Sequence, residues 1–147
     1  MILIQKAQYS DLIKFSEFDN QHHAGEFFRY KPLQEHQKDF QSEGVVYLSI
    51  KDNTGNVVGY FILQLDVAGK AIQFKRILVG YEHLGIGQNA ICLMEEYCKN
   101  KFEVNRIWLD VYEDNHKAKH IYEKLGYIKF REGTGASKIV YFYEKHL

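Results

Sequence analysis

Two glycines near the middle of the chain have a spacing that is typical of phosphate binding. The segment GIGQNA begins at Gly85 and fits the pattern G-x-G-x-x-A, with Gly87 as its second glycine. A β-rich run precedes the segment and a helical pattern follows it. Glycine permits close approach of the backbone, and the N–H groups at the start of a helix attract an anion. The pattern predicts a phosphate-binding loop, although a plain strand-to-helix turn would use glycine in the same way.

A nicotinamide dinucleotide is one candidate ligand for this loop. Asp110 lies 20 residues after Ala90, at the end of a second β-rich run, where an acid would bond a ribose hydroxyl. However, five residues (80–84) separate the first run from Gly85, whereas a dinucleotide turn follows its strand directly. Only 37 residues follow Asp110, too few for the remaining β-α units of that fold. The longer loop, residues 82–87, would instead present several amides to a diphosphate.

A second segment favours another family. In RIWLDVYEDNHKAKHIYEKLGYIKF, the spaced residues are Leu109, Val111, Asn115, Ala118, Tyr122, Gly126 and Tyr127. They resemble the second block of the GNAT superfamily of acyl-CoA-dependent N-acetyltransferases, L-x-V-x-x-x-N-x-x-A-x-x-x-Y-x-x-x-G-F/Y. The family's first block, a strand, then Q/R-x-x-G-x-G/A, then a helix, resembles the glycine segment. The resemblance is strong over residues 74–130 and includes the bacterial ribosomal-protein and N-terminal acetyltransferase-like branch.

This resemblance implies acetyl-CoA as the acyl donor and direct transfer to a primary amine in a ternary complex. The pyrophosphate would lie on the amides of residues 82–87, and pantetheine would lie between two strands. The N–H of Leu78 or Val79 would polarise the thioester carbonyl. Asn115 would cap a helix and bond the pantetheine arm. The implied cofactor-binding residues are Leu78, Val79, Glu82, His83, Leu84, Gly85, Ile86, Gly87, Gln88 and Asn115. The alternative is a non-catalytic acyl-CoA-binding or sensory module on the same fold.

Two residues are the catalytic candidates that the resemblance implies. Tyr122 lies where the family has the tyrosine that protonates the coenzyme A sulfur; a phenol of pKa about 10 suits a thiolate of pKa about 8.5. Asp110 lies where protein N-terminal acetyltransferases have a glutamate, and it would accept the amine proton directly or through water. Glu113, Glu26 and Glu144 are weaker candidates for the base. A purely structural Asp110 would pair with a cation, the candidates being Arg106, Lys75 and Arg76.

Glu82 departs from the family pattern, which has Gln or Arg at this place. A carboxylate about 4 Å from a phosphate charge would repel it by about 4 kcal/mol at an effective dielectric constant of 20. We therefore expect the Glu82 side chain to point to solvent, with only its amide contributing, while a protonated His83 offsets part of the charge. Lys117 and Lys119 are candidates to meet the 3′-phosphate.

Composition limits the remaining classes of ligand and partner. Nineteen basic residues balance nineteen acidic ones, so no overall charge draws the chain to nucleic acid or to an anionic membrane. His116 and His120 have a zinc-ligand spacing but no third ligand, so we expect no metal. Cys92 and Cys98 are expected to be reduced core residues. No secretory signal pattern opens the sequence, and we expect a cytoplasmic monomer or homodimer. The acceptor is expected to be a small-molecule or peptide amine.

The elements that must position these residues follow from periodicity. Strands are expected at residues 1–7, 45–51, 57–65, 71–79, 106–111, 127–132 and 137–144, and helices near 11–18, 32–40, 87–101 and 115–125. Only the segment from 71 to 111 reads as a parallel β-α-β crossover. The sequence thus predicts a single α+β domain over residues 1–147. Its sheet should be mixed but mostly antiparallel, with helices on both faces.

Local signals predict where elements begin and end. Ser10 is expected to cap the first helix, and Pro32 to occupy the first position of the second. Gly126 is expected just after the last helix, and hairpins are expected around DNTGN and GTGA. The acceptor is expected to enter beside residues 20–42 and the C-terminal hairpin, which carry the aromatic residues Phe27, Phe28, Tyr30, Tyr141, Phe142 and Tyr143.

Overall fold

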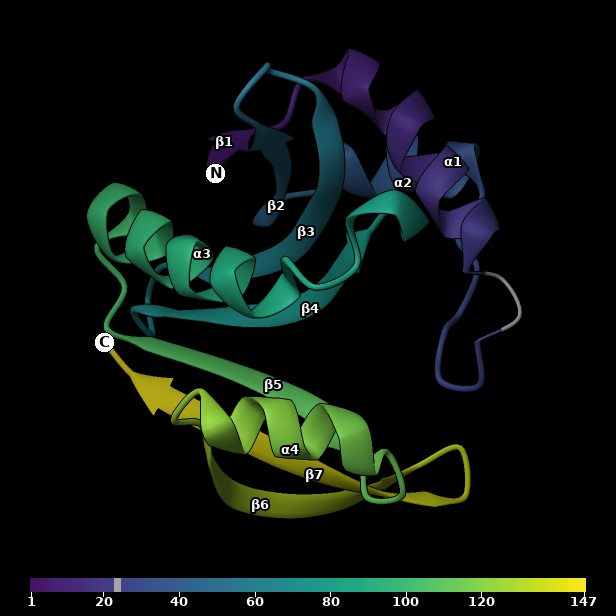
Figure 1. Cartoon of the computed structure of the whole chain (residues 1–147). Coiled ribbons are helices and arrows are strands. Elements are labelled where there is room, and N and C mark those ends of the chain that lie inside the picture. Colours follow the sequence, from purple (N-terminus) through teal and green to yellow (C-terminus); the bar gives the residue numbers. More distant parts are fainter. Residues whose placement is uncertain (23–24) are drawn as a thin grey trace.

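The chain forms a seven-stranded sheet with helices on both faces (Figure 1). The computed structural model describes residues 1–22 and 25–147. The strands are β1 (Ile2–Lys6), β2 (Val45–Asp52), β3 (Val57–Asp66), β4 (Ala71–Val79), β5 (Arg106–Tyr112), β6 (Ile128–Gly135) and β7 (Lys138–His146). The helices are η1 (Tyr9–Asp11), α1 (Leu12–Gln21), α2 (Leu33–Phe40), η2 (Tyr81–His83), α3 (Gly87–Phe102) and α4 (His116–Lys124), of which η1 and η2 are short 3-10 helices.

The strands lie in the order β1-β2-β3-β4-β5-β7-β6. Neighbouring strands are antiparallel except for β4 and β5, which run parallel because α3 carries the chain back across the sheet. This topology confirms the predicted fold class, a mixed and mostly antiparallel sheet with one β-α-β unit. In Figure 1, α3 and α4 cover one face, and α1 and α2 lie on the other side of β2–β4.

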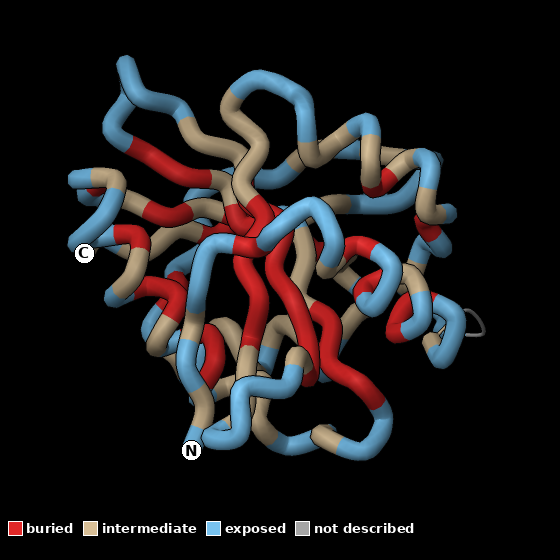
Figure 2. Tube along the Cα trace, turned by 90° about the horizontal axis from the view of Figure 1, so that it is seen from above, coloured by how far each residue is buried: buried red, intermediate tan, exposed pale blue. Residues whose placement is uncertain are grey.

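Two apolar clusters hold the layers together. One packs α3 and α4 against the sheet and includes Phe61, Ile72 and Met94, whereas the other packs α1 and α2 against the opposite face and includes Phe15 and Tyr60. Successive side chains of a strand point to opposite faces, so β3 contributes to both clusters. Buried residues, red in Figure 2, therefore run along the central strands and the inner sides of the helices. None of the helices within the described residues is long and apolar enough to span a bilayer.

The signals at the last helix are confirmed. The Asn115 side-chain oxygen accepts a hydrogen bond from the Ala118 N–H at 3.3 Å, which caps the start of α4. Gly126 has φ of +96°, a conformation that glycine adopts without strain, and it ends the helix.

Two predictions near the N-terminus were wrong by a few residues. Ser10 does not cap α1, because the chain first forms η1, in which the Asp11 carboxylate accepts the Gln8 N–H at 2.9 Å. Pro32 is the cap residue before α2 rather than its first helical residue, and its extended backbone (ψ of 162°) turns the chain into the helix.

Two further predictions need correction. The predicted C-terminal hairpin is present, but its turn consists of Ala136 and Ser137, which have φ of +51° and +64°, and therefore includes only the last residue of GTGA. Two positive φ values in a two-residue loop match the twist of the flanking strands, so β6 continues to Gly135. Cys98 is buried as expected, but Cys92 is exposed, because the buried side of α3 continues through Ile91.

Candidate active site

The candidate site lies where β4 and β5 separate. Their parallel pairing extends only from Ala71–Arg106 to Gln73–Trp108. Just beyond, Ile62 of β3 pairs with Arg76 and Leu63 pairs with Phe74, so Lys75 is an extra, bulged residue in β4. A bulge bends its strand and strengthens the twist. β4 therefore leaves β5 at Lys75, and a gap opens between the two strands.

A cleft of about 400 Å³ opens on the α3 and α4 side of this gap. Its walls are mostly apolar side chains of β4, α3 and α4, and one end is formed by the glycine loop. The lining residues are Ile77, Val79, Leu84, Gly85, Gly87, Gln88, Ile91, Lys117, Ala118, Ile121 and Tyr122. We call this space the cofactor cleft, because it contains the glycines that the sequence motif singled out.

The glycine loop offers several backbone amides to a ligand. The N–H groups of His83 and Ile86 donate to Gly80 and His83 carbonyls at 2.9 and 3.4 Å and are thus engaged. Within the described residues, the N–H groups of Gly85, Gly87, Gln88 and Asn89 have no such acceptor, since a helix leaves its first N–H groups unpaired; the Ala90 N–H is the first of α3 to be engaged, with the Ile86 carbonyl at 2.9 Å. Gly85 has φ of +108° and open space around the place of a Cβ. An anion at this end of the cleft would meet N–H groups and the positive end of α3.

The end of β4 presents Val79, and not Leu78, to the cleft. The Leu78 side chain packs in the α1 and α2 core, whereas the Val79 side chain lines the cleft. The Gly80 N–H donates to the Val58 carbonyl at 2.9 Å. Because bonded pairs alternate along an antiparallel ladder, the Val79 N–H and C=O point away from β3.

A second cavity of about 400 Å³ lies on the other side of Tyr122. Residues of β4, β5, α4, the C-terminal hairpin and the α1–α2 connection line it, namely Phe27, Lys75, Asp110, Val111, Tyr112, Asn115, Ala118, Tyr122, Gly135 and Val140. We call it the acceptor cavity. The connection and the hairpin were the predicted acceptor side, although Phe28 and Tyr30 do not line the cavity. Residues 23 and 24 of the predicted 20–42 segment lie outside the described residues.

Tyr122 lies between the two spaces and lines both. Its ring makes edge contacts with the rings of Phe74 and Tyr127, each with centroids 5.9 Å apart. Tyr127 is itself held by a 2.8 Å hydrogen bond to Glu95 of α3. In the described part of the chain the Tyr122 hydroxyl has no hydrogen-bond partner. Burial raises the pKa of Tyr122 to about 12, so the phenol keeps its proton at neutral pH.

Asp110 faces the acceptor cavity from β5. Loss of hydration raises the pKa of its carboxyl group, and the charge of Lys75 opposes this shift. The other proposed partners are engaged elsewhere: Arg106 Nε donates to Glu144 at 2.6 Å, and Arg76 Nη1 lies 3.4 Å from Asp19. Among the described residues, Asp110 forms no ion pair, so its carboxylate remains available to a ligand.

The alternative bases are less well placed. Glu144 is committed to Arg106, and Glu113 lines a separate, smaller cavity beside Lys138. Glu26 is exposed and lines neither the cofactor cleft nor the acceptor cavity.

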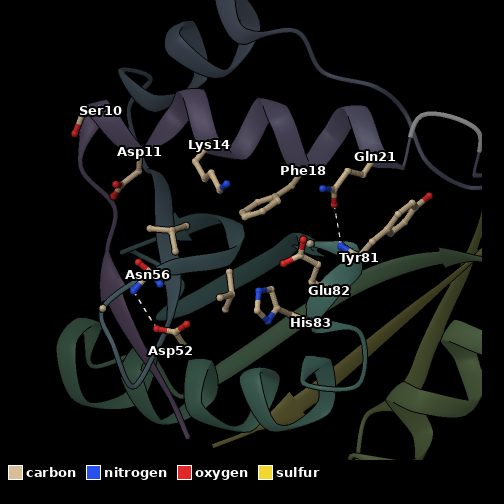
Figure 3. A pocket seen from close by; sticks show the side chains of 14 residues that line it. Ser10, Asp11, Lys14, Phe18, Gln21, Asp52, Asn56, Tyr81, Glu82 and His83 are labelled. Carbon is tan, nitrogen blue, oxygen red and sulfur yellow. Dashed lines mark hydrogen bonds between the residues drawn. The ribbon is translucent and has the colours of Figure 1, made fainter.

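A third cavity, of about 560 Å³, lies between α1, the β2–β3 turn and η2 (Figure 3). The side chains of Glu82 and His83 line this cavity and not the cofactor cleft. Glu82 is exposed. Its carboxylate therefore points away from the glycine loop, as the charge argument predicts.

The remaining predicted residues lie in the cofactor cleft, in the acceptor cavity or outside both. Lys117 lines the cofactor cleft, whereas Lys119 lies over the Tyr141 ring, with its ammonium 4.9 Å from the ring centroid. Asn115 caps α4 and lines the acceptor cavity. His116 and His120 are exposed, and no cluster of metal-ligating side chains occurs in the described ranges.

Several lining residues escaped the sequence motifs. Tyr112 and Val140 line the acceptor cavity, and Ile77 and Ile121 line the cofactor cleft. Phe27 was expected on the acceptor side, and Lys75 was named only as a possible partner of Asp110. The run AIQFKRILV predicts a strand, but it also contains Gln73 and Arg76, so nothing in it singles out Lys75.

Solved structures share this fold. Spermidine N-acetyltransferase from Vibrio cholerae in complex with CoA and spermine superposes with a TM-score of 0.81 at 17% identity, covering 99% of this chain and 95% of that one. A dodecameric structure of the spermidine N-acetyltransferase from Vibrio cholerae gives a TM-score of 0.77 at 18% identity, covering 99% and 93%. At these identities the likeness establishes the fold.

Sequence comparison identifies the family. A search of curated proteins finds no match to this chain. The model of the acetyltransferase (GNAT) family, however, matches residues 9–127. The predicted superfamily is thereby confirmed, and the chain belongs to the acetyltransferase (GNAT) family, whose members transfer an acetyl group from acetyl-CoA to an amine.

Proposed function

We propose that this chain binds acetyl-CoA in the cofactor cleft and acetylates a primary amine bound in the acceptor cavity. The amine belongs to a small molecule or a peptide, and the transfer is direct within one ternary complex. The observation that carries the proposal is the position of Tyr122, which lines both spaces. A thioester sulfur on one side and an amine on the other would both lie near its hydroxyl. Neither Cys92 nor Cys98 lines either space, which argues against a covalent acyl-cysteine route.

The residues of the cofactor cleft fit the parts of acetyl-CoA. The free amides of Gly85 and of the first turn of α3 suit the pyrophosphate. The apolar walls suit the pantetheine arm, and Lys117 suits a phosphate near the loop. The Val79 N–H, directed away from β3, would donate to the thioester carbonyl oxygen as negative charge develops there. Acetyl-CoA supplies the activated acyl group, and the protein supplies orientation and proton transfer.

Asp110 would act as the base. Most primary amines are protonated near pH 7, and the carboxylate accepts this proton directly or through a water molecule. The neutral nitrogen then bonds to the carbonyl carbon as the carbon–sulfur bond breaks. The carboxylate first releases the proton that it accepted from the ammonium to solvent. It then accepts the second proton, which the nitrogen loses after bonding to carbon, and passes it to solvent as well.

Tyr122 would stabilise the departing sulfur. A phenol with a pKa near 12 transfers its proton incompletely to a thiolate of pKa about 8.5. Its main contribution is therefore a hydrogen bond that strengthens as charge develops on sulfur, and the CoA thiolate leaves and takes its proton from solvent.

The first test is a comparison of thermal stability with acetyl-CoA, free CoA and NADH. A ligand at 100 times its dissociation constant adds about 2.7 kcal/mol to the free energy of unfolding, which raises the melting temperature by several degrees. Stabilisation by acetyl-CoA and CoA, followed by acetylation of members of an amine panel, would support the proposal. Stabilisation by NADH alone would contradict it. Binding without turnover of any amine would favour a non-catalytic acyl-CoA-binding module.

A further inference from the structure

The charged side chains of the acceptor cavity carry information about the acceptor. Among the described lining residues, Asp110 is the single carboxylate and Lys75 the single ammonium. Lys138 adds a second cation at the wall: its Nζ lies 5.2 Å from the centroid of the Phe27 ring and 5.1 Å from that of Tyr112. Lys138 also lies 3.4 Å from Asp114, and that pair is exposed. The cavity itself is thus not acidic.

An acceptor with several ammonium groups fits this cavity poorly. Asp110 can serve one ammonium, the one whose nitrogen is acetylated. A second ammonium would lie near Lys75 or near Lys138, with no further lining carboxylate to balance it. An ammonium taken out of water needs a partner of opposite charge. The aromatic pair of Phe27 and Tyr112, which could hold a cation, already faces the Lys138 ammonium.

Lys75 and Asp110 present opposite charges to the same cavity. Lys75 is the bulged residue of β4, Asp110 lies on β5, and the strands separate between them. The charge of Lys75 lowers the pKa of Asp110 in part. Within the described residues, however, the two side chains form no ion pair. Both groups are therefore free to bind a ligand. An α-amino acid carries an ammonium and a carboxylate on one carbon atom, which matches this arrangement.

We propose that the acceptor is a free α-amino acid whose amine lies at Asp110 and whose carboxylate lies at Lys75. The apolar surfaces of Phe27, Tyr112 and Val140 would contact an apolar side chain of this amino acid. The cavity volume of about 400 Å³ suits such a small acceptor. This inference rests on the proposed function and specifies its substrate class.

The test uses the purified protein, acetyl-CoA, and an equimolar mixture of the twenty α-amino acids, with N-acetyl products identified by mass spectrometry. Leucine is then compared with leucinamide, which lacks the carboxylate, and with spermidine. The inference expects kcat/KM for leucine, or for the best amino acid, to exceed that for its amide by about tenfold or more, with spermidine poorer still. Equal rates for acid and amide, or a preference for spermidine, would overturn it.

Lys75→Gln locates the carboxylate contact. This variant should reduce the ratio of kcat/KM for amino acid over amide to within about threefold of unity, mainly through KM for the amino acid. Because this ratio compares two substrates of the same variant, any effect of the substitution on Asp110 that changes both rates equally cancels. Lys99→Gln, an exposed lysine on α3, serves as the control and should keep the wild-type ratio. An unchanged ratio in Lys75→Gln would overturn the assignment.

The two proposals fail in different ways. If acetyl-CoA does not stabilise the protein, or if no amine at all is acetylated, the proposed function fails. If other amines are acetylated while the amino acids are not, the proposed function stands and the amino-acid inference is wrong.

Discussion

His22 Nε2 donates a 2.7 Å hydrogen bond to the backbone carbonyl oxygen of Val79. The bond connects the C-terminal end of α1 to the last residue of β4, at the edge of the cofactor cleft. A second link lies beside it, since the Tyr81 N–H donates to the side-chain oxygen of Gln21 at 2.8 Å. These two contacts tie α1 to the start of the loop that contains Gly85 and Gly87.

Loss of one of these links should weaken acetyl-CoA binding. A hydrogen bond contributes about 1 kcal/mol net, so Gln21→Ala is expected to raise the Kd for acetyl-CoA about fivefold, measured by isothermal titration calorimetry. Lys14→Ala, an exposed change on the same helix, is the control and should bind as the wild type does. Equal Kd values for Gln21→Ala and the wild type would mean that α1 does not support the loop.

Tyr122→Phe removes the hydroxyl that lies between the two spaces. We expect kcat to fall about 100-fold while the Kd for CoA stays within about twofold, because the phenol acts on sulfur only as the bond breaks. The ring contacts with Phe74 and Tyr127 remain in this variant, so the fold should be preserved. Full activity in Tyr122→Phe would exclude the hydroxyl from the reaction. Tyr97→Phe on α3, away from both spaces, is the matched control.

Asp110→Asn should remove the acidic limb of the pH–rate profile. Burial raises the pKa of this carboxyl above its ordinary value of 3.8, and only the ionised form can accept a proton. Wild-type kcat/KM should therefore rise as pH rises through that raised pKa. In Asp110→Asn this rise should be absent and the rate at neutral pH about 100-fold lower. If the acidic limb persists, another group is the base.

The same variant should not be less stable at pH 7. A carboxyl whose pKa is raised on folding binds its proton more tightly in the folded state than in the unfolded state. Its contribution to stability therefore falls as pH rises through the folded-state pKa. Asp110 is exposed, so the charge loses only part of its hydration on folding and the effect is small. Asparagine removes that charge, so thermal unfolding at pH 7 should show an equal or slightly higher melting temperature. A lower melting temperature would mean that the carboxylate makes a stabilising contact.

Gly85→Ala should weaken cofactor binding through its backbone. With φ of +108°, alanine is strained there, and relief of the strain would move the loop amides. We expect about a tenfold higher Kd for acetyl-CoA, which corresponds to about 1.4 kcal/mol. Gly55→Ala is a matched control, with φ of +88° and equally open surroundings in the β2–β3 turn. It should lower the melting temperature comparably but leave the Kd unchanged; a shared loss of affinity would point to general destabilisation.

Asp19→Ala should be the most destabilising single change of those considered. Asp19 is fully buried and accepts hydrogen bonds from Tyr60 and, at 2.7 Å, from His36, while Arg76 lies 3.4 Å away. Removal of one partner from a buried charged network costs about 3–5 kcal/mol. For a chain of this length the melting temperature should fall by about 10 °C. Glu17→Ala on the exposed side of α1 should change it by less than about 2 °C.

Local patterns were sufficient for the elements and for much of the site. The periodicity of β-rich runs predicted β4 to the residue, and Asn115 and Gly126 marked the ends of α4 because capping and positive φ depend on adjacent residues. Motif spacing likewise singled out Gly85, Gly87 and Tyr122, since a loop and one helix position them. The roles of these residues stay predictions until the variants are measured.

Long-range pairing decided what local patterns could not. Lys75 becomes a bulged residue only because β3 pairs with β4 in a shifted register, and this pairing opens the gap beside Asp110. Phe27 reaches the acceptor cavity from a connection whose sequence has no regular pattern. The buried hydrogen bonds of Asp19 join it to His36, which is 17 positions away in the sequence, and to Tyr60, which is 41 positions away. Periodicity reports the conformation of a segment, whereas register, strand separation and buried charge depend on which distant segments pack together.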